Sequence, residues 1–269
     1  MADLKSSRAP VCAGTFYPRQ ANRLGAMVSD FLNKASDPLA KVPKAIIAPH
    51  AGYSYSGPIA GSSFIPLTKA KDNKTLNRVI LIGPSHLVAF EGIALSDAAE
   101  FVTPLGNVSV DQAALAELSS LSYVRFFERA HAQEHSLEVE LPFLQHLLAD
   151  FQLVPLVVGD AADKQIEAVL DRLWGGPETL IVVSSDLSHY HTYSAAKKID
   201  HNTAQAVEEL RPEQIQSEHA CGYLPIRGLL RSARHRGLKP QTIDLRNSGD
   251  TSGPRDRVVG YGAFAFLEN

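Results

Sequence analysis

Three histidines each follow a short, nearly all-apolar run of residues and a small polar turn: His50, His86 and His189. Each run has the length and the β-branched content of a strand that is buried on both faces, as in the middle of a parallel sheet. Ligands of open α/β sheets bind just beyond the carboxyl ends of the strands. The pattern therefore predicts that three imidazoles meet at one edge of a sheet and form a site there.

His50 and His86 are presented in the same way, because each comes directly after a turn that contains proline. Taken singly, such a histidine is more often a loop residue that bonds its own turn. Two histidines that follow nearby strands in the same way favour a metal site, since neutral imidazole is the commonest protein ligand for Zn, Cu and Fe.

Asp186 and His189 lie three residues apart after the third apolar run. If the strand passes straight into a helix, this spacing places both side chains on one face. A carboxylate near an imidazole raises its basicity and fixes its tautomer, which suits a general base or a partner behind the site. The alternative is an aspartate that caps a helix beside an incidental histidine.

Cys221 precedes Gly222 and a helix expected to begin at Pro225. A thiolate close to a helix N-terminus is stabilised by the helix dipole, which favours a metal ligand or a nucleophile. The alternative is a buried, inert thiol.

The segment Glu134-His-Ser-Leu-Glu138 is expected to open another helix. Capping accounts for Glu134 and Ser136, whereas His135 is a candidate for lining the cleft. Tyr55, in the turn that follows His50, is a second candidate.

Apolar runs alternate with segments of helical periodicity along the chain. Strands are expected at residues 44–48, 78–82, 153–158, 179–184, 242–245 and 257–267, with short β pieces between 93 and 110. Helices are expected at residues 21–34, from Pro58 onward, and at 111–121 with Asp111 as N-cap, 135–149, 163–173, 194–209 and 225–236. Residues up to Pro18 resemble an arm. This alternation predicts one α/β domain over residues 1–269, with a central mixed, mainly parallel sheet and helices on both faces.

Composition narrows the class of protein. The 269 residues are 45% hydrophobic and 20% charged, with a net charge of −3, so nothing favours binding to nucleic acid or to an anionic membrane surface. No apolar stretch approaches the ~20 residues that span a bilayer, and residues 1–10 lack the apolar core of a signal peptide. We expect a cytoplasmic protein in which Cys12 and Cys221 are thiols. Phosphate-binding glycine loops and a Gly-x-Ser-x-Gly elbow do not occur in the sequence.

Several motifs in fixed order resemble the Memo family, also called protein B of the AmmeMemoRadiSam system. They are Ala48-Pro-His50-Ala-Gly-Tyr, Leu81-Ile-Gly-Pro-Ser-His86, the segment from Glu134 to Phe143, Val182-Val-Ser-Ser-Asp186-Leu-Ser-His189, Ala220-Cys221-Gly222, and the closing stretch from Asn247 through Val258-Val-Gly-Tyr-Gly-Ala-Phe264. The resemblance begins at Ala13 and covers almost the whole chain.

The resemblance implies a fold similar to that of the class III, LigB-type extradiol dioxygenases, which are non-haem iron enzymes. It implies that His50 and His86 are metal ligands, that Cys221 is the third ligand, and that His189 is a catalytic histidine with Asp186 as its companion. The dioxygenases have a carboxylate as third ligand, whereas this chain offers a thiolate. A Cys/His/His set suits Zn or Cu at least as well as Fe.

We therefore predict a metal-dependent, dioxygenase-like oxidoreductase that acts on a small molecule, with His189 as proton donor or acceptor. One alternative is a protein without enzymatic activity, which binds peptides or partner proteins beside a relic or regulatory metal site. Another is a hydrolase that uses metal-bound water or the Cys221 thiolate. The family name also suggests a radical-SAM protein as partner.

Overall fold

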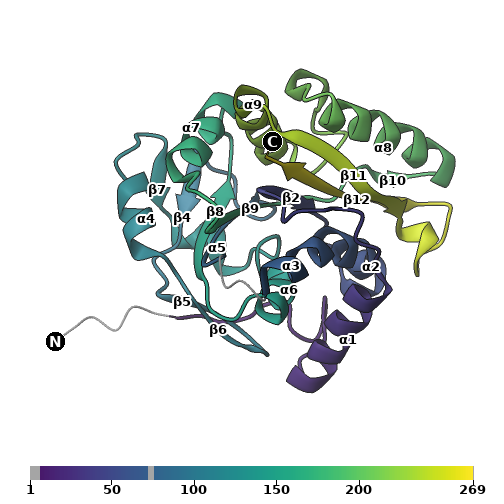
Figure 1. The fold of residues 1–269 in the computed structure, drawn as a ribbon, viewed down its shortest axis with the longest axis horizontal. Coiled ribbons are helices and arrows are strands. Elements are labelled where there is room, and N and C mark those ends of the chain that lie inside the picture. Colours follow the sequence, from purple (N-terminus) through teal and green to yellow (C-terminus); the bar gives the residue numbers. More distant parts are fainter. Residues whose placement is uncertain (1–6, 72–75, 269) are drawn as a thin grey trace.

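Four parallel strands form the centre of the molecule, and they lie side by side in an order that differs from their order in the chain. The order is β2 (Ala45–Ala48), β9 (Thr179–Ser184), β3 (Arg78–Pro84) and β8 (Gln152–Val158). The structure is a computed structural model that describes residues 7–71 and 76–268 (Figure 1). Because β9 lies between β2 and β3, the segments that follow these three strands emerge next to one another.

The sheet becomes mixed on both sides of this parallel centre. Beyond β2, β12 (Val258–Leu267) runs antiparallel and pairs with β11 (Lys239–Asn247) and β10 (His189–His191). Beyond β8 lie antiparallel β4 (Ile93–Leu95) and then β7 (Val124–Phe126), which is parallel to β4. The mixed sheet is confirmed, with parallel pairing in its centre and between β4 and β7. A separate small sheet contains β1 (Ser7–Arg8), β5 (Glu100–Thr103) and β6 (Gly106–Ser109).

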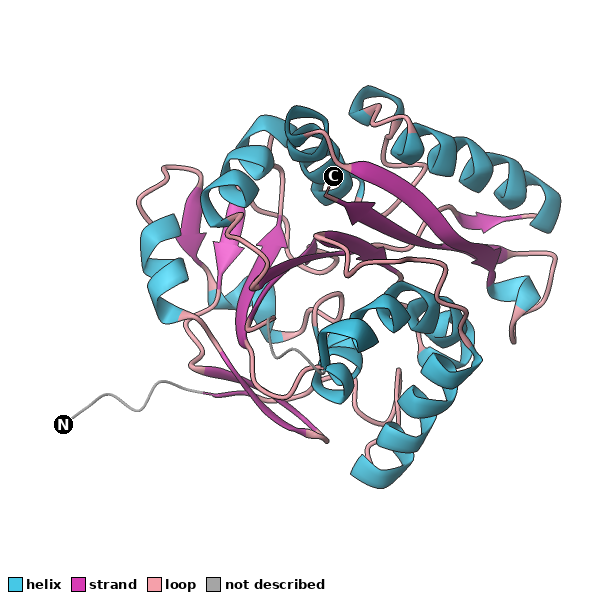
Figure 2. Cartoon of the chain, in the orientation of Figure 1, coloured by secondary structure: helices cyan, strands magenta, loops and turns pink. Residues whose placement is uncertain are grey.

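Helices cover both faces of the central sheet, as predicted (Figures 1 and 2). One group lies on one face: α1 (Ala21–Lys34), α2 (Tyr53–Phe64), α3 (Thr68–Lys71) and α6 (Leu141–Leu147). The opposite face carries α7 (Asp163–Leu173), α8 (Tyr193–Glu208) and α9 (Tyr223–Arg236), while α4 (Gln112–Leu118) and α5 (Glu128–Ala132) lie near β4 and β7. Short 3-10 helices occupy 65–67, 138–140, 212–214 and 248–250. Within the described part of the chain, no helix combines the length and hydropathy needed to cross a bilayer.

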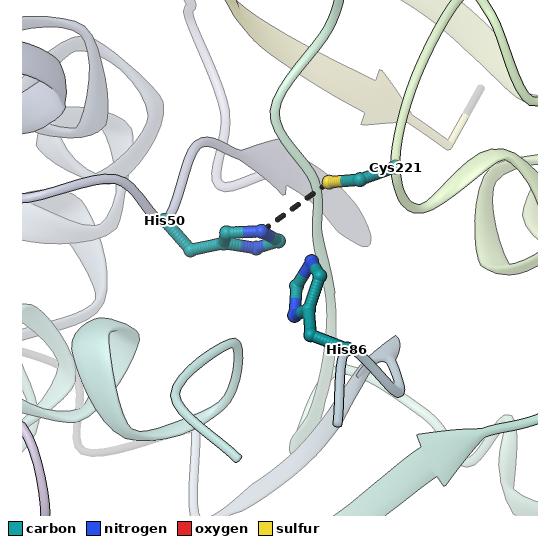
Figure 3. A group of neighbouring side chains, drawn as sticks. All are labelled: His50, His86 and Cys221. Atoms are coloured by element: carbon teal, nitrogen blue, oxygen red, sulfur yellow. Dashed lines mark hydrogen bonds between the residues drawn. The ribbon is translucent and has the colours of Figure 1, made fainter. Parts of the chain in front are cut away.

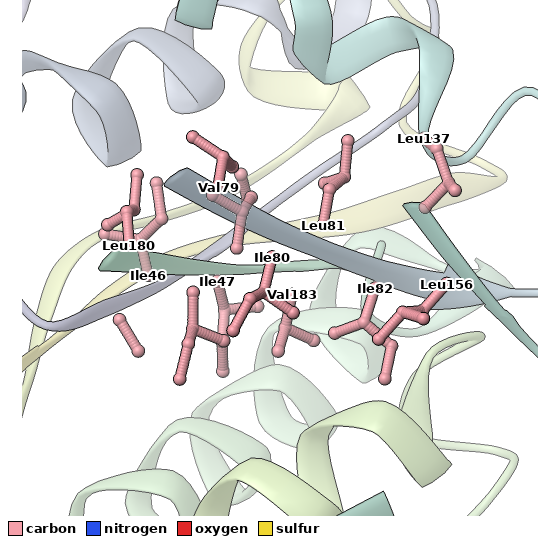
Figure 4. Packing of buried hydrophobic residues seen from close by; sticks show 14 of the residues in the cluster. Ile46, Ile47, Val79, Ile80, Leu81, Ile82, Leu137, Leu156, Leu180 and Val183 are labelled. Carbon is pink, nitrogen blue, oxygen red and sulfur yellow. The ribbon is translucent and has the colours of Figure 1, made fainter. Parts of the chain in front are cut away.

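The core explains why the central strands are apolar at every position. On β3, Val79 and Leu81 extend to one side of the strand and Ile80 and Ile82 to the other (Figure 4), and all four are fully buried. Successive side chains of a strand point to opposite faces, so a strand covered by helices on both faces has no polar side. The apolar runs in the sequence therefore reflect the burial of these strands on both faces.

The helix predicted to begin at Pro58 begins five residues earlier, at Tyr53. The Gly52 carbonyl accepts hydrogen bonds from the N–H groups of Tyr55 and Ser56, and the Tyr53 N–H donates to the carbonyl of Phe16. These bonds satisfy the first turn, so Pro58 lies inside the helix rather than at its start. The sequence predicts a helix start at Pro58 because proline favours the first helical position. The hydrogen bond from Tyr53 to Phe16 joins two segments and is not encoded in the local pattern.

The helix predicted for residues 135–149 was also wrong in its extent. A turn occupies the first residues, a 3-10 helix follows at Glu138–Glu140, and α6 spans only Leu141–Leu147. The carboxylates of Glu134 and Glu138 bond to groups elsewhere in the fold, which replaces regular helical bonding there.

The short elements β1, β7, β10 and α5 were not predicted, and the other differences concern element ends. Asp111 caps α4 as expected, by accepting a hydrogen bond from the Ala114 N–H, but the helix ends at Leu118. β11 extends on both sides of the expected residues 242–245. Residues 1–6 of the predicted arm lie outside the described residues. Cys12 and Cys221 are both free, as predicted.

Candidate metal centre

The predicted meeting of strand ends at one edge of the sheet is confirmed. His50 follows β2, His86 follows β3, and Asp186 follows β9, which lies between them. Cys221 reaches the same place from the loop before α9. Figure 3 shows the two imidazoles and the thiol facing one another.

Three donor atoms converge at this place, one each from His50, His86 and Cys221, and all lie within 4.8 Å of one another. The Cys221 sulfur lies 3.3 Å from Nε2 of His50. The two imidazole rings have centroids 5.2 Å apart and stand nearly perpendicular. These are the three residues that the resemblance to the Memo family implies as ligands, and their donor atoms are close enough to share one metal ion.

His50 is held with its Nε2 toward the other two donors. Its Nδ1 lies 2.8 Å from the hydroxyl of Ser184, and that hydroxyl lies 2.6 Å from the carbonyl oxygen of Ser136. Glu140 Oε1 lies 2.8 Å from the same hydroxyl. The single Ser184 proton is directed to these two acceptors, so the hydroxyl accepts the Nδ1 proton of His50. Burial, with the neighbouring His86 as a second cause, holds the pKa of His50 well below its ordinary value. His50 is therefore neutral, and its Nε2 lone pair faces the Cys221 thiol.

His86 is oriented by a buried carboxylate. Glu134 accepts hydrogen bonds from the His86 Nδ1 at 2.8 Å and from the His86 backbone N–H at 2.6 Å. Burial opposes ionisation of Glu134, but the bonds to the ring and backbone of His86 outweigh it and lower its pKa to about 2. Since a carboxylate only accepts, Nδ1 carries a proton, which leaves Nε2 as the ring nitrogen available to a metal ion. A carboxylate behind a histidine is the arrangement that fixes metal-binding imidazoles.

Cys221 departs from one expectation. Burial raises the pKa of its thiol to about 12, with Asp186 as a second cause, so the helix that follows does not by itself produce a thiolate. α9 begins at Tyr223, one residue beyond Gly222. The Gly222 N–H donates to the Ser185 hydroxyl, and a Cβ on Gly222 would lie 2.7 Å from the Ser185 side chain. Glycine here lets the Cys221 loop pack directly on the end of β9.

The predicted link between Asp186 and His189 is absent. The chain does not enter a helix after β9, and Asp186 accepts the backbone N–H of His50 at 2.9 Å. His189 instead donates from Nδ1 to the carbonyl of Leu187, at 2.7 Å. Asp186 thus holds the loop that carries His50, and a backbone carbonyl fixes His189. Burial raises the pKa of Asp186 to about 7 and lowers that of His189 below its ordinary value.

A cleft of about 570 Å³ opens over the site, and both additional candidates, Tyr55 and His135, line it. His189 and Asp186 line it as well. The His135 ring stacks on that of His86, with centroids 4.5 Å apart, and packs against Phe16 on its other side. His50 and His86 also line the cleft, and nine residues complete the lining: Ala51, Gly52, Tyr190, Ser248, Gly253, Pro254, Arg257, Val259 and Tyr261.

Two residues that orient the histidine rings were not predicted as part of the site. Glu134 was interpreted as a capping residue, yet it also bonds the ring of His86, and Ser184 was counted as part of a strand end, yet it orients His50. Both contacts join segments far apart in the chain. The only available signal was the acidic residue directly before His135 and the paired serines at the end of β9.

The sequence of the chain is similar to those of known proteins. The model of a family described as Memo-like protein matches residues 8–265. The chain belongs to the Memo family. A MEMO1 family protein of Nitrosopumilus maritimus is 32% identical over 97% of this chain and 99% of its own length. Those of Sulfolobus acidocaldarius and Aquifex aeolicus are each 34% identical, over 94% and 97% of this chain and 97% and 99% of their own.

Among solved structures, an uncharacterized protein from Escherichia coli K12 is similar with a TM-score of 0.48 and 13% identity. The match covers 81% of this chain and 98% of that one. Membership in the Memo family confirms the resemblance drawn from the sequence motifs. The likeness to class III dioxygenases stays a prediction.

Proposed function

We propose that this Memo-family protein binds one transition-metal ion through His50, His86 and Cys221 and uses it in oxidation–reduction of a small molecule. The observation that carries the proposal is the convergence of three donor atoms within 4.8 Å beside the open cleft, with the Nδ1 atom of each imidazole already occupied by a partner. Two imidazoles locked in the ligating tautomer are what a metal site requires.

The donor set fits such an ion. One sulfur and two imidazole nitrogens suit Zn, Cu or Fe(II) and are unsuited to Mg²⁺ or Ca²⁺, which prefer oxygen. A protein ligand set of three is typical of catalytic sites, where water or substrate completes the coordination. When bound, such a metal supplies redox or Lewis-acid chemistry.

The residues of the chain supply the remaining functions of an active site. His189 donates its Nδ1 proton to the Leu187 carbonyl, so its Nε2 is free to take a proton from a molecule in the cleft. Its lowered pKa keeps it in the neutral form that can act as a base. Asp186 fixes the backbone of His50, and Glu134 fixes the ring of His86.

Metal analysis tests the first half of the proposal. We expect close to one equivalent of a transition metal in anaerobically purified protein and none in His50→Ala or Cys221→Ala. Cys12→Ala and His201→Ala serve as matched controls, since neither residue contacts the site, and both should retain the metal. Absence of metal from the wild type after incubation with Zn(II), Cu(I) and Fe(II) would refute the site.

Oxygen uptake by iron-loaded and copper-loaded protein tests the second half. We expect consumption with at least one catechol, thiol or related small reductant, and loss of that consumption in His189→Ala with the metal retained. A fully loaded protein that turns over nothing, yet binds peptides in the cleft, would instead support the alternative of a binding protein without enzymatic activity.

A further inference from the structure

The cleft above the metal centre has an uneven distribution of charge. Its floor carries the imidazoles, and its walls carry aromatic side chains, among them Phe16, Tyr55 and Tyr261. Arg257 is the one lysine or arginine among the described lining residues. It directly precedes β12, and its side chain is exposed. The cleft therefore combines an apolar wall with a single cationic group.

Arg257 is held in place by a tyrosine rather than by an acid. Its guanidinium carbon lies 4.7 Å from the centre of the Tyr190 ring, and no carboxylate among the described residues forms an ion pair with it. Asp186, the one acid among the described lining residues, is buried and accepts the backbone N–H of His50. Stacking uses the face of a guanidinium and leaves its N–H edge free to bind an anion.

The backbone at Tyr190 is strained, which indicates that its position matters. Its φ is +62°, a left-handed conformation that side chains other than glycine rarely adopt. The strain coincides with a break in register, because His189 and His191 on β10 pair with the adjacent residues Val259 and Val258 on β12. This bulge places the tyrosine ring against Arg257, and such bulges re-aim side chains next to active sites.

We infer that the ligand of the cleft is a small aromatic acid whose carboxylate is bound by the N–H edge of Arg257. This rests on the proposed function for the role of the metal, but not for the binding itself. A carboxylate matches the guanidinium edge through two parallel hydrogen bonds. A single ring fits a cleft of about 570 Å³ and contacts its aromatic walls. Because His50 and His86 line the same cleft, we expect the end of the ring away from the carboxylate to face them.

The test uses 4-fluorobenzoate and its neutral counterpart 4-fluorobenzamide, titrated into metal-free protein and followed by fluorine NMR. We expect the acid to bind at least tenfold more tightly than the amide. Arg257→Gln should abolish that preference, and Arg257→Lys should retain part of it, since an ammonium keeps the charge but not the paired geometry. Arg23→Gln, which removes an exposed arginine on α1, should change neither affinity.

A tenfold preference that survives in Arg257→Gln, or no binding of the acid to the wild type, would overturn the inference. Because this titration uses metal-free protein, it tests the role of Arg257 even if the metal proposal fails. Co(II)-loaded protein then reports orientation: the fluorine, opposite the carboxylate, should relax strongly if Arg257 binds the acid. If the fluorine instead relaxes weakly while the acid stays bound, the carboxylate is on the metal and the assignment to Arg257 is wrong.

Discussion

Glu134 shows how much of the site depends on one side chain that is not itself among the proposed ligands. Its carboxylate accepts four hydrogen bonds, from the His86 ring and from the N–H groups of His86, His135 and Ser136. These bonds fix at once the ring that would bind metal and the turn that places His135 over it. The residue therefore sets both the tautomer and the position of His86.

Replacing Glu134 with glutamine should weaken metal binding. In the glutamate, one oxygen accepts the backbone N–H of His86, and the other accepts the His86 ring N–H and the N–H groups of His135 and Ser136. An amide has only one acceptor oxygen, so its NH₂ group would face one of these two sets of donors. We expect roughly a 10- to 100-fold loss of Zn(II) affinity, the usual cost of losing such a partner, measured by competition with a chromogenic chelator. Glu128→Gln, at a carboxylate that bonds Ser96 and Asp97, is the control and should leave the affinity unchanged.

Among the elements, one buried acid binds four groups of the N-terminal arm. Glu138 on the 3-10 helix is fully buried and accepts hydrogen bonds from Arg8, Tyr17 and the backbone N–H groups of Val11 and Cys12. The arm in turn places Phe16 against His135 in the cleft wall. One wall of the site thus depends on a contact that lies away from the proposed ligands.

Glu138→Ala should therefore destabilise the fold strongly, because it leaves the Arg8 guanidinium buried without its carboxylate. We expect a loss of about 3–5 kcal/mol in the free energy of unfolding, measured with urea, and faster proteolysis of the arm. Asp30→Ala removes an exposed ion pair with Lys34 and should cost less than about 1 kcal/mol. Equal effects of the two changes would contradict this account of the arm.

The contact between α1 and α2 depends on glycines packed under Phe31. A Cβ on Gly61 would lie 2.8 Å from the backbone oxygen of Phe31, whereas a Cβ on Gly25 would meet nothing closer than 3.9 Å. Alanine is favoured over glycine inside a helix by about 1 kcal/mol. The two positions therefore separate helix propensity from packing.

We expect opposite signs for the two substitutions. Gly25→Ala should raise the free energy of unfolding by up to about 1 kcal/mol. Gly61→Ala should lower it by about 1–3 kcal/mol, because a backbone atom cannot yield as a side chain can. Urea unfolding of both variants measures the difference, and stabilisation by Gly61→Ala would show that the helices can separate at little cost.

At the scale of the whole molecule, a buried histidine outside the site links stability to pH. His131 donates from Nε2 to the Ala94 carbonyl, and its Nδ1 has no hydrogen-bond partner among the described residues. Burial lowers its pKa to about 4. Between pH 6.5 and about 4 the unfolded chain binds a proton here that the folded chain does not, so this group makes stability fall as pH falls through that range.

His131 is expected to lower the free energy of unfolding by about 3 kcal/mol as the pH falls from 6.5 to about 4. His131→Gln keeps a donor for Ala94 and removes the titration, so its stability should fall less than that of the wild type between pH 7.5 and pH 4.5. Urea unfolding of the metal-free proteins at both pH values measures this. Identical pH dependence in the two proteins would show that His131 is already protonated in the fold.

The sequence predicted those parts of the structure that local patterns encode. His50 and His86 could be found because an apolar strand and a proline turn lie next to each in the chain. Cys221 could be assigned to the same site only by resemblance, since it lies far from both histidines. The start of α2, the role of Glu134 and the partner of His189 could not be predicted, because each depends on a contact with another segment or on the course of the chain after β9.

The position of β9 between β2 and β3 has a consequence for selectivity. Adjacent strands lie about 4.8 Å apart, so His50 and His86 start from backbones separated by about twice that distance, and β9 fills the interval with small serines. The backbone separation beneath the two imidazoles is thus set by the hydrogen-bond ladder of the sheet, and the partners of their Nδ1 atoms restrict rotation of the rings. For a metal ion bound as proposed, the sheet would therefore set the spacing of its two nitrogen donors.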